Sequence, residues 1–108
     1  MKIHVLGCSA AEMPNSSLTS FLVDEKILLD AGTIGSALSE SRQRKIKYAL
    51  ITHAHLDHIK DLPFFADTLS SNNKVQHVTL ISTLEISSAI KQNLFNNYSG
   101  FHLLFRET

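Results

Sequence analysis

Three of the six histidines in the chain fall within six residues, His53-Ala54-His55-Leu56-Asp57-His58. In an extended segment His53 and His55 point to the same side, so their imidazoles can share one cation, at about 2.0–2.1 Å each for zinc. The chain must turn after His55, and Asp57 and His58 can then face a second cation nearby. Cations about 3.5–4 Å apart are the usual arrangement for hydrolysing phosphate esters. The spacing predicts one or two divalent cations, with zinc favoured and manganese or iron possible.

The elements around this cluster would place it at the end of a sheet. An apolar run at residues 48–52 predicts a buried strand directly before the cluster, and Pro63 suits the first position of a helix that runs to about Leu69. Ligands that follow a buried strand lie where α/β sheets place their sites. Further strands are expected at 2–6, 78–82 and 101–105, and a hairpin of 20–23 and 26–29 is expected to turn at Asp24-Glu25. One helix is expected at 34–43, with Thr33 as its N-cap. Another is expected to begin with the capping box Ser82-Thr83-Leu84-Glu85 and to end at Asn96-Asn97. Strands that alternate with helices predict an α/β layered fold.

Composition limits the class of protein. The chain has 108 residues, of which 44% are hydrophobic, which is enough for one small domain. Ten basic residues balance ten acidic ones, so the net charge offers no argument for nucleic acid, and the basic run at 42–47 is interpreted as a solvated helix end. Cys8 is the single cysteine and is expected to be a small buried hydrophobe. Without a signal peptide or a long apolar run, a soluble cytoplasmic protein that does not span a membrane is expected.

The cluster, together with the threonine before it, resembles the metal-binding motif of the metallo-β-lactamase superfamily. The resemblance implies that His53 and His55 bind one metal ion, and that Asp57 and His58 bind a second. Asp30 matches the aspartate that supports the histidine loop from beneath in that family, and such carboxylates fix histidine orientation and tautomer. A local turn at the end of a strand is the alternative interpretation of Asp30.

The same resemblance implies that this is an α/β chain forming the N-terminal half of an αββα sandwich. The remaining metal ligands of the family lie further downstream, in a fold about twice this length. Residues 1–108 are therefore interpreted as a single incomplete domain, either a truncated product or a fragment. His4, His77 and His102 are not expected to be ligands. Half a sandwich leaves one face of its sheet uncovered, so a homo-oligomer is also expected.

A narrower similarity is to class II cyclic-nucleotide phosphodiesterases. It extends from the cluster to Leu62-Pro63, and includes residues 29–33 and 83–97; Asp61 departs from it, standing where that family has glycine or serine. It implies a metal-dependent hydrolase of small-molecule phosphodiesters, with a cyclic nucleotide as substrate and nucleic acid as an unlikely partner. The reaction would use a metal-bound hydroxide oriented by Asp57 as the catalytic residue.

Two alternatives stay open. Residues 6–10 and 15–17 are similar to the opening of tRNA 3′-processing endonucleases, although that family usually has glycine where this chain has Leu56. The second alternative is a non-catalytic metal-binding or oligomerising remnant of a truncated hydrolase. Whether the chain is an enzyme is therefore undecided from its sequence.

Overall fold

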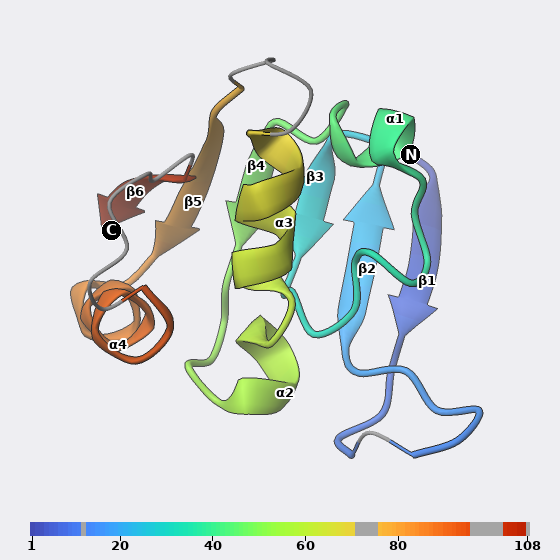
Figure 1. Cartoon of the computed structure of the whole chain (residues 1–108), viewed down its shortest axis with the longest axis horizontal. Helices are drawn as coiled ribbons and strands as arrows, with labels where there is room; N and C mark the ends of the chain where they lie inside the picture. Colours follow the sequence, from blue (N-terminus) through green and yellow to red (C-terminus); the bar gives the residue numbers. More distant parts are fainter. Residues whose placement is uncertain (12, 71–75, 96–102, 108) are drawn as a thin grey trace.

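The computed structural model describes residues 1–11, 13–70, 76–95 and 103–107 as a mixed sheet with helices (Figure 1). The elements in chain order are β1 (Ile3–Gly7), β2 (Ser20–Val23), β3 (Ile27–Leu29), α1 (Glu40–Gln43), β4 (Tyr48–Leu50), α2 (Leu56–Ile59), α3 (Leu62–Leu69), β5 (Val78–Ser82), α4 (Leu84–Leu94) and β6 (Leu103–Glu107). The strands lie in the sheet in the order β1-β2-β3-β4-β5-β6. β1, β2 and β3 are antiparallel, whereas β3, β4, β5 and β6 run parallel.

The hairpin of β2 and β3 confirms the turn expected at Asp24-Glu25. Both residues have positive φ angles, 51° and 61°. Positive φ at both central residues is the backbone of a type I′ turn, whose twist matches that of the strands it joins. The hairpin sets the pairing of Val23 with Ile27 and of Phe21 with Leu29.

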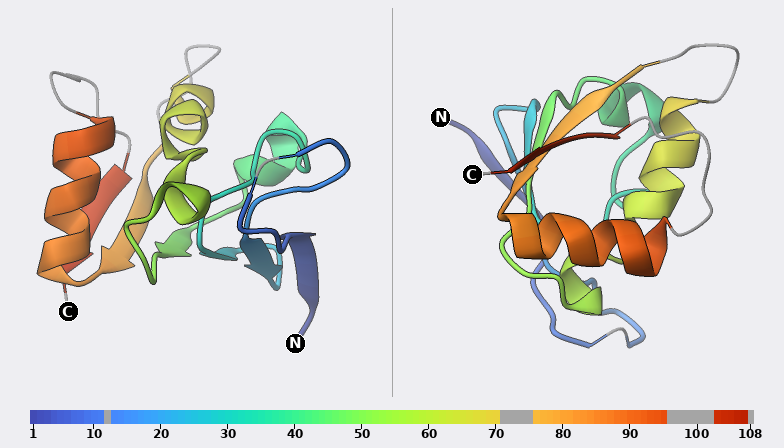
Figure 2. Two further views of the ribbon diagram at one scale, coloured as in Figure 1. Left: turned by 90° about the horizontal axis from the view of Figure 1, so that it is seen from below. Right: turned by 90° about the vertical axis from the view of Figure 1, so that its left-hand side faces the viewer.

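The four described helices lie on one face of the sheet, as the two side views show (Figure 2). One row of strand residues across the sheet faces them, including Leu22, Leu28, Ala49 and Leu80, each no more than 1% exposed. Helices α3 and α4 add Phe65 and Ile90, among other buried side chains, to the same core. The expected α/β layered fold is confirmed.

The opposite face of the sheet is apolar, and no described helix covers it. Its side chains form two rows across the paired strands, and several are exposed, for example Ile3 (58%), Val5 (54%) and Leu104 (52%). The other apolar members are Phe21, Val23, Ile27, Leu29, Tyr48, Leu50 and Ile81. The uncovered face expected of half a two-layer sandwich is therefore present.

The helix expected at 34–43 is wrong over most of its length. Only Glu40–Gln43 are helical, and the N-cap is Ser39, whose hydroxyl accepts from the backbone N–H of Arg42. Ile34 and Leu38 are buried as an amphipathic helix would require, but a turn joins them, with the Leu38 N–H bonded to the Ile34 carbonyl. The turn is stabilised by Asp61, 27 residues later in the sequence, whose carboxylate accepts the N–H of Ile34.

Most other boundaries shift by a residue or two. The helix after β5 is capped by Thr83, which accepts from the N–H of Ile86, because Ser82 is still part of the strand and is buried. The expected capping box therefore starts one residue too early. Asn96-Asn97 and residues 101–102 of the expected last strand lie outside the described residues. Among the described residues, no helix is long and apolar enough to cross a membrane.

Candidate metal centre

The six residues from His53 to His58, called the histidine loop below, lie at the carboxyl end of the parallel strands (Figure 1). Strand β4 ends at Leu50, and residues 51–54 lead without regular secondary structure to His55, the N-cap of α2, whose φ of −73° and ψ of 146° are extended. Asp57 and His58 lie in the first helical residues that follow. The turn expected after His55 is therefore present, at the start of α2.

Asp30 connects the end of β3 to the start of the histidine loop. Its carboxylate accepts the backbone N–H of Thr52 at 2.8 Å and the Thr52 hydroxyl at 2.7 Å. Asp30 is 6% exposed and has a φ of 59°, a left-handed conformation that aspartate tolerates better than most residues. The hydroxyl of Ser20 donates to its carbonyl oxygen at 2.8 Å. The two bonds to Thr52 join residues 22 apart in sequence, so they are not those of a local turn.

The Thr52 hydroxyl determines which nitrogen of His53 is free. A carboxylate can only accept, so the hydroxyl gives its proton to Asp30 and can in turn accept from His53 Nδ1, 2.8 Å away. This arrangement places the His53 proton on Nδ1 and leaves the lone pair on Nε2. Asp30 thus acts on the His53 tautomer through Thr52, as carboxylates commonly do for metal-binding histidines.

His58 lies between two carboxylates. Its Nδ1 is 3.1 Å from Asp30 Oδ2, and its Nε2 is 3.4 Å from Asp57 Oδ2. The Nδ1 atom is buried and, although close to Asp30, has no hydrogen bond of acceptable angle, so a small rotation of the ring would be needed to form one. His58 Nε2 and Asp57 face the same side of the loop.

The donor set fits a divalent cation in its chemistry and, for one pair, in its spacing. Two ligands about 2.0–2.1 Å from a tetrahedral cation are about 3.4 Å apart, which is the separation of His58 Nε2 and Asp57 Oδ2. The His53 ring centroid lies 4.7 Å from that of His58 and 5.8 Å from that of His55. Within the described part of the chain, however, no three such side chains converge on one point. His53 and His55 are both exposed, and the Thr52 hydroxyl holds the His53 ring at Nδ1.

The backbone of residues 31–32 supports the histidine loop from the other side. The N–H of Ala31 donates to the His58 carbonyl at 2.7 Å. A Cβ at Gly32 would lie 2.1 Å from the Asp57 carbonyl oxygen, so only glycine fits there. Sequence reasoning gave no separate role to Thr52 or Gly32, although both stand in the stretches that it matched.

Asp61, the position that departs from the phosphodiesterase pattern, has its carboxylate bonded to another loop. Its Oδ2 accepts the backbone N–H groups of Ile34 at 2.6 Å and Gly35 at 3.2 Å. The carboxylate thereby stabilises the turn after β3, and its charge is engaged with these two amides.

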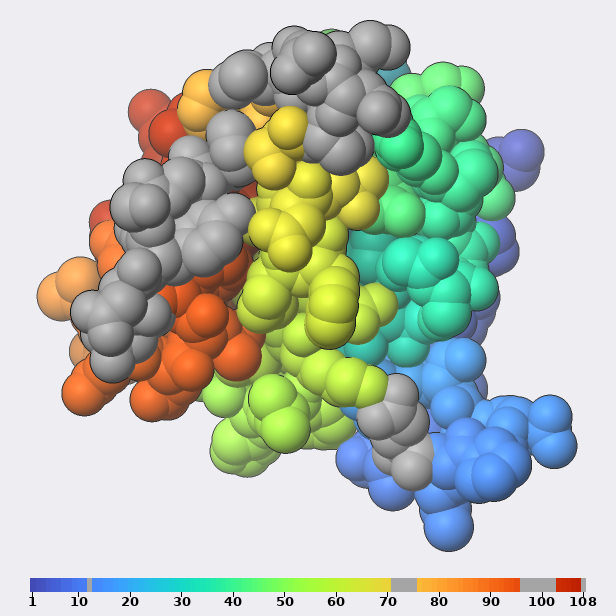
Figure 3. All heavy atoms as spheres, in the orientation of Figure 1, coloured from blue at the N-terminus to red at the C-terminus, as the bar shows by residue number. Residues whose placement is uncertain are grey.

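The histidine loop borders a shallow pocket of about 290 Å³, lined by Ala10, Leu18, Leu56, Asp57 and Lys60. The loop of residues 8–19 projects beside α2 at this point (Figure 3). Leu56 is 63% exposed at the rim. A substrate could therefore reach the carboxylate of Asp57 from this side.

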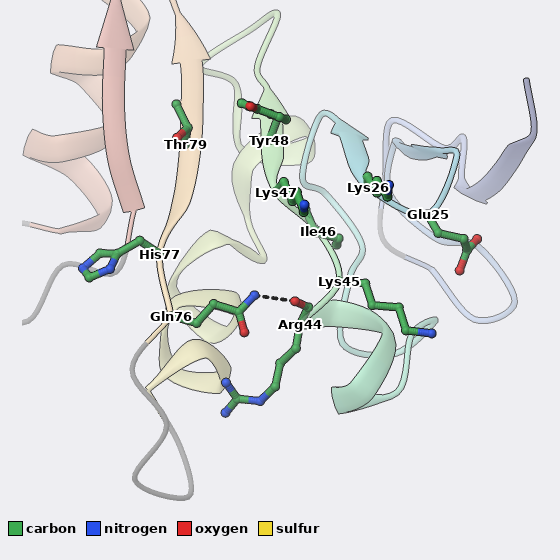
Figure 4. A pocket seen from close by; sticks show the side chains of 10 residues that line it. All are labelled: Glu25, Lys26, Arg44, Lys45, Ile46, Lys47, Tyr48, Gln76, His77 and Thr79. Carbon is green, nitrogen blue, oxygen red and sulfur yellow. Dashed lines mark hydrogen bonds between the residues drawn. The ribbon is translucent and has the colours of Figure 1, made fainter.

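The other residues singled out in the sequence lie elsewhere. Cys8 is exposed, so its expected burial is wrong, because the strand β1 ends at Gly7 and the chain leaves the core there. His4 lies on β1, and its Nδ1 is 3.1 Å from the Arg42 guanidinium. His77 is exposed just before β5, at the opposite end of the sheet from the histidine loop (Figure 4). His102 is outside the described residues.

Comparison with known proteins identifies the family. The sequence signature of the metallo-beta-lactamase superfamily matches residues 14–79, which include Asp30 and the whole histidine loop. The chain belongs to the metallo-beta-lactamase superfamily, whose members are metal-dependent hydrolases.

Among curated proteins the chain is similar to two enzymes named ribonuclease Z. The one from Clostridium beijerinckii (strain ATCC 51743 / NCIMB 8052) is 30% identical over 97 residues, which are 83% of this chain and 32% of that protein. The one from Clostridium kluyveri (strain ATCC 8527 / DSM 555 / NBRC 12016 / NCIMB 10680 / K1) is 30% identical over 89 residues, 75% of this chain and 29% of that protein. The chain thus spans about a third of the length of these relatives.

Solved structures show the same fold. The metallo-beta-lactamase fold protein YhfI from Bacillus subtilis matches with a TM-score of 0.73 at 19% identity, over 98% of this chain and 45% of that one. The short form of human tRNase Z matches with a TM-score of 0.68 at 19% identity, over 99% and 45%. The interpretation of the fold as about half of a metallo-β-lactamase sandwich is confirmed.

The expected partners need correction. The curated relatives are ribonucleases, so the expectation of a cyclic nucleotide as substrate, with nucleic acid an unlikely partner, is wrong. The narrower resemblance to cyclic-nucleotide phosphodiesterases is not supported, and the endonuclease alternative fits the relatives better. The chain's zero net charge is an average over its whole surface, so it gives no evidence against a local basic site.

Proposed function

We propose that this chain carries the histidine-loop half of a metal-dependent phosphodiesterase that acts on RNA, with a tRNA precursor as first substrate to test. The 30% identity to two ribonuclease Z enzymes supports the substrate class. The observation that carries the chemistry is the 3.4 Å separation of His58 Nε2 and Asp57 Oδ2, which suits two ligands of one cation.

Each residue of the loop would have a defined task. His53 and His55 would hold one cation, and His58 and Asp57 the other. Imidazole and carboxylate donors favour zinc, with manganese or iron as further possibilities. Divalent cations bound there would supply activation of water and stabilisation of charge on the phosphate. Asp30 would keep the His53 proton on Nδ1 through Thr52, so that Nε2 stays available.

The first experiment measures bound metal. The purified chain and two variants, His55→Ala/His58→Ala and His4→Gln, are loaded with zinc, desalted and analysed for metal content. We expect zinc in the wild type and in the His4→Gln control, whose imidazole lies outside the loop, and little in the double variant. Equal zinc in all three proteins would contradict the ligand assignment.

The second experiment measures hydrolysis. Hydrolysis of a tRNA precursor, a bis-aryl phosphodiester, a β-lactam and a thioester is followed with zinc or manganese, for the wild type and the double variant. Metal-dependent cleavage of the RNA that the double variant lacks supports the proposal. Turnover of a β-lactam or a thioester, with neither phosphodiester cleaved, would refute the substrate class.

A second candidate is a metal-binding module without catalysis. It is favoured by the observation that no three potential ligands converge on one point among the described residues. Zinc that depends on the histidine loop, found together with no hydrolysis of either phosphodiester, would support this candidate over the enzyme.

A further inference from the structure

A second pocket lies at the other end of the sheet, where β3, β4 and β5 begin (Figure 4). It has a volume of about 510 Å³, and its basic lining consists of Lys26, Arg44, Lys45 and Lys47; Tyr48 lies beside them. We call it the basic pocket. Three separate segments form it, because parallel strands bring their amino ends to one edge of the sheet. Backbone bonds hold the edge, with the Lys47 N–H donating to the Lys26 carbonyl at 2.8 Å.

The three lysines of the basic pocket are exposed and, within the described residues, form no ion pair. The guanidinium of Arg44 is already engaged, since it donates to the Thr68 carbonyl at 2.7 Å and to Glu40 at 3.0 Å. The pocket's single carboxylate, Glu25, is paired with Arg42 at 2.9 Å. The lysine ammonium groups are therefore the charges left available for a ligand.

Charge is concentrated here although the chain as a whole is neutral. Four of its ten lysine and arginine residues line this one pocket. Like charges held close together repel one another, and a bound anion relieves that repulsion. A pocket with this lining selects a ligand that carries several negative charges.

We propose that the basic pocket binds backbone phosphates of an RNA, an inference that rests on the proposed function. Lysine ammonium groups act as point charges toward phosphates and need no fixed donor geometry. Tyr48, which is 46% exposed and belongs to the uncovered face of the sheet, borders the same pocket and offers a ring on which a base can stack. Enclosed sites suit small ligands, whereas an open pocket with exposed lysines and an aromatic ring at its border suits a polymer.

The position of the basic pocket relative to the histidine loop is set by β3. Lys26 directly precedes this strand and Asp30 directly follows it, so the two residues are separated by roughly 13 Å of extended chain. A polynucleotide that reaches the histidine loop can therefore extend to the basic pocket. The pocket would add affinity for the RNA without taking part in bond cleavage.

The test compares two double variants of the full chain that remove equal charge. Lys26→Gln/Lys47→Gln changes the basic pocket, and Lys2→Gln/Lys91→Gln changes exposed lysines elsewhere. Binding of a fluorescein-labelled single-stranded RNA is followed by anisotropy across a salt titration. We expect about tenfold weaker binding for the pocket variant, a salt slope reduced by about 1.4, and a much smaller change for the control.

Lysine footprinting on the wild-type chain gives a measurement that does not depend on the variants folding. We expect RNA to protect Lys26 and Lys47 from acetylation and to leave Lys2 and Lys91 reactive. Absence of protection at the pocket lysines, or equal weakening in both double variants, overturns the proposal. Displacement of the RNA by AMP or inorganic phosphate at equal phosphate concentration also overturns it, because the pocket would then bind small anions.

The inference and the proposed function fail separately. RNA cleavage without protection of Lys26 and Lys47 would contradict the inference and leave the proposed function intact. Protection of these lysines without any RNA cleavage would support the inference and contradict the proposed enzyme.

Discussion

Replacing Asp30 tests the central contact of the candidate site. Its carboxylate accepts two hydrogen bonds from Thr52 and lies 3.1 Å from His58 Nδ1. Hydrogen bonds to a charged group contribute about 1.5–3 kcal/mol each, and Asp30→Ala also leaves a backbone N–H of Thr52 without a partner. Since such contributions are not fully additive, we expect Asp30→Ala to lower the free energy of unfolding by about 4 kcal/mol.

Asp24 provides a matched control for the backbone. It also has a positive φ, 51° against 59° for Asp30, but it is exposed and its carboxylate accepts one bond, from the N–H of Lys2. Asp24→Ala therefore carries the same left-handed strain and loses only a solvent-exposed bond, at about 1 kcal/mol. The difference of about 3 kcal/mol between the two variants isolates the buried bonds of Asp30.

Urea unfolding followed by circular dichroism measures this difference. For a slope of about 2 kcal/mol per molar urea, 3 kcal/mol separates the two midpoints by roughly 1.5 M. Equal midpoints for Asp30→Ala and Asp24→Ala would refute the argument that the Asp30 carboxylate anchors the histidine loop.

Asp30→Asn separates anchoring from the control of tautomers. An amide nitrogen in place of Oδ2 would donate to the Thr52 hydroxyl, which would then donate to His53 Nδ1 and leave the His53 proton on Nε2. We expect a folded variant whose zinc affinity is about 10–100-fold weaker, as is typical when such supporting groups change. Wild-type zinc affinity, measured by competition with a chelator, would show that the proposed relay does not operate.

Three further changes test the packing around the site. Gly32→Ala should destabilise the chain by more than about 3 kcal/mol and lower its bound zinc, because the new Cβ would lie 2.1 Å from a carbonyl oxygen of the histidine loop. Gly35→Ala is the control: a Cβ there has nothing within 4 Å, so the variant should be tolerated in the same urea and metal assays. Phe65→Ala should cost about 3–5 kcal/mol at a 1% exposed core position, against less than about 0.5 kcal/mol for Phe64→Ala at 67% exposure, and equal urea midpoints would contradict the described core. Thr83→Ala should remove the N-cap of α4 and lower the free energy of unfolding by about 1 kcal/mol. Thr83→Ser, which keeps the hydroxyl, should retain most of the wild-type free energy of unfolding.

Local sequence was sufficient for the features that depend on neighbouring residues. The turn after His55, the hairpin at Asp24-Glu25 and the strand of residues 78–82 each follow from side-chain periodicity or turn chemistry, and each is present in the structure. The family could be predicted for the same reason, because its motif lies in one short stretch of chain.

Contacts between distant residues decided the rest. The turn after β3 replaces an expected helix because Asp61, 27 residues away, binds the N–H of Ile34. Asp30 reaches Thr52 across two neighbouring strands, and through it the proton on His53, which no local pattern indicates. The basic run at 42–47 is visible in the sequence, but the basic pocket forms only because the parallel strands bring Lys26 and residues 76–79 beside it at one edge of the sheet.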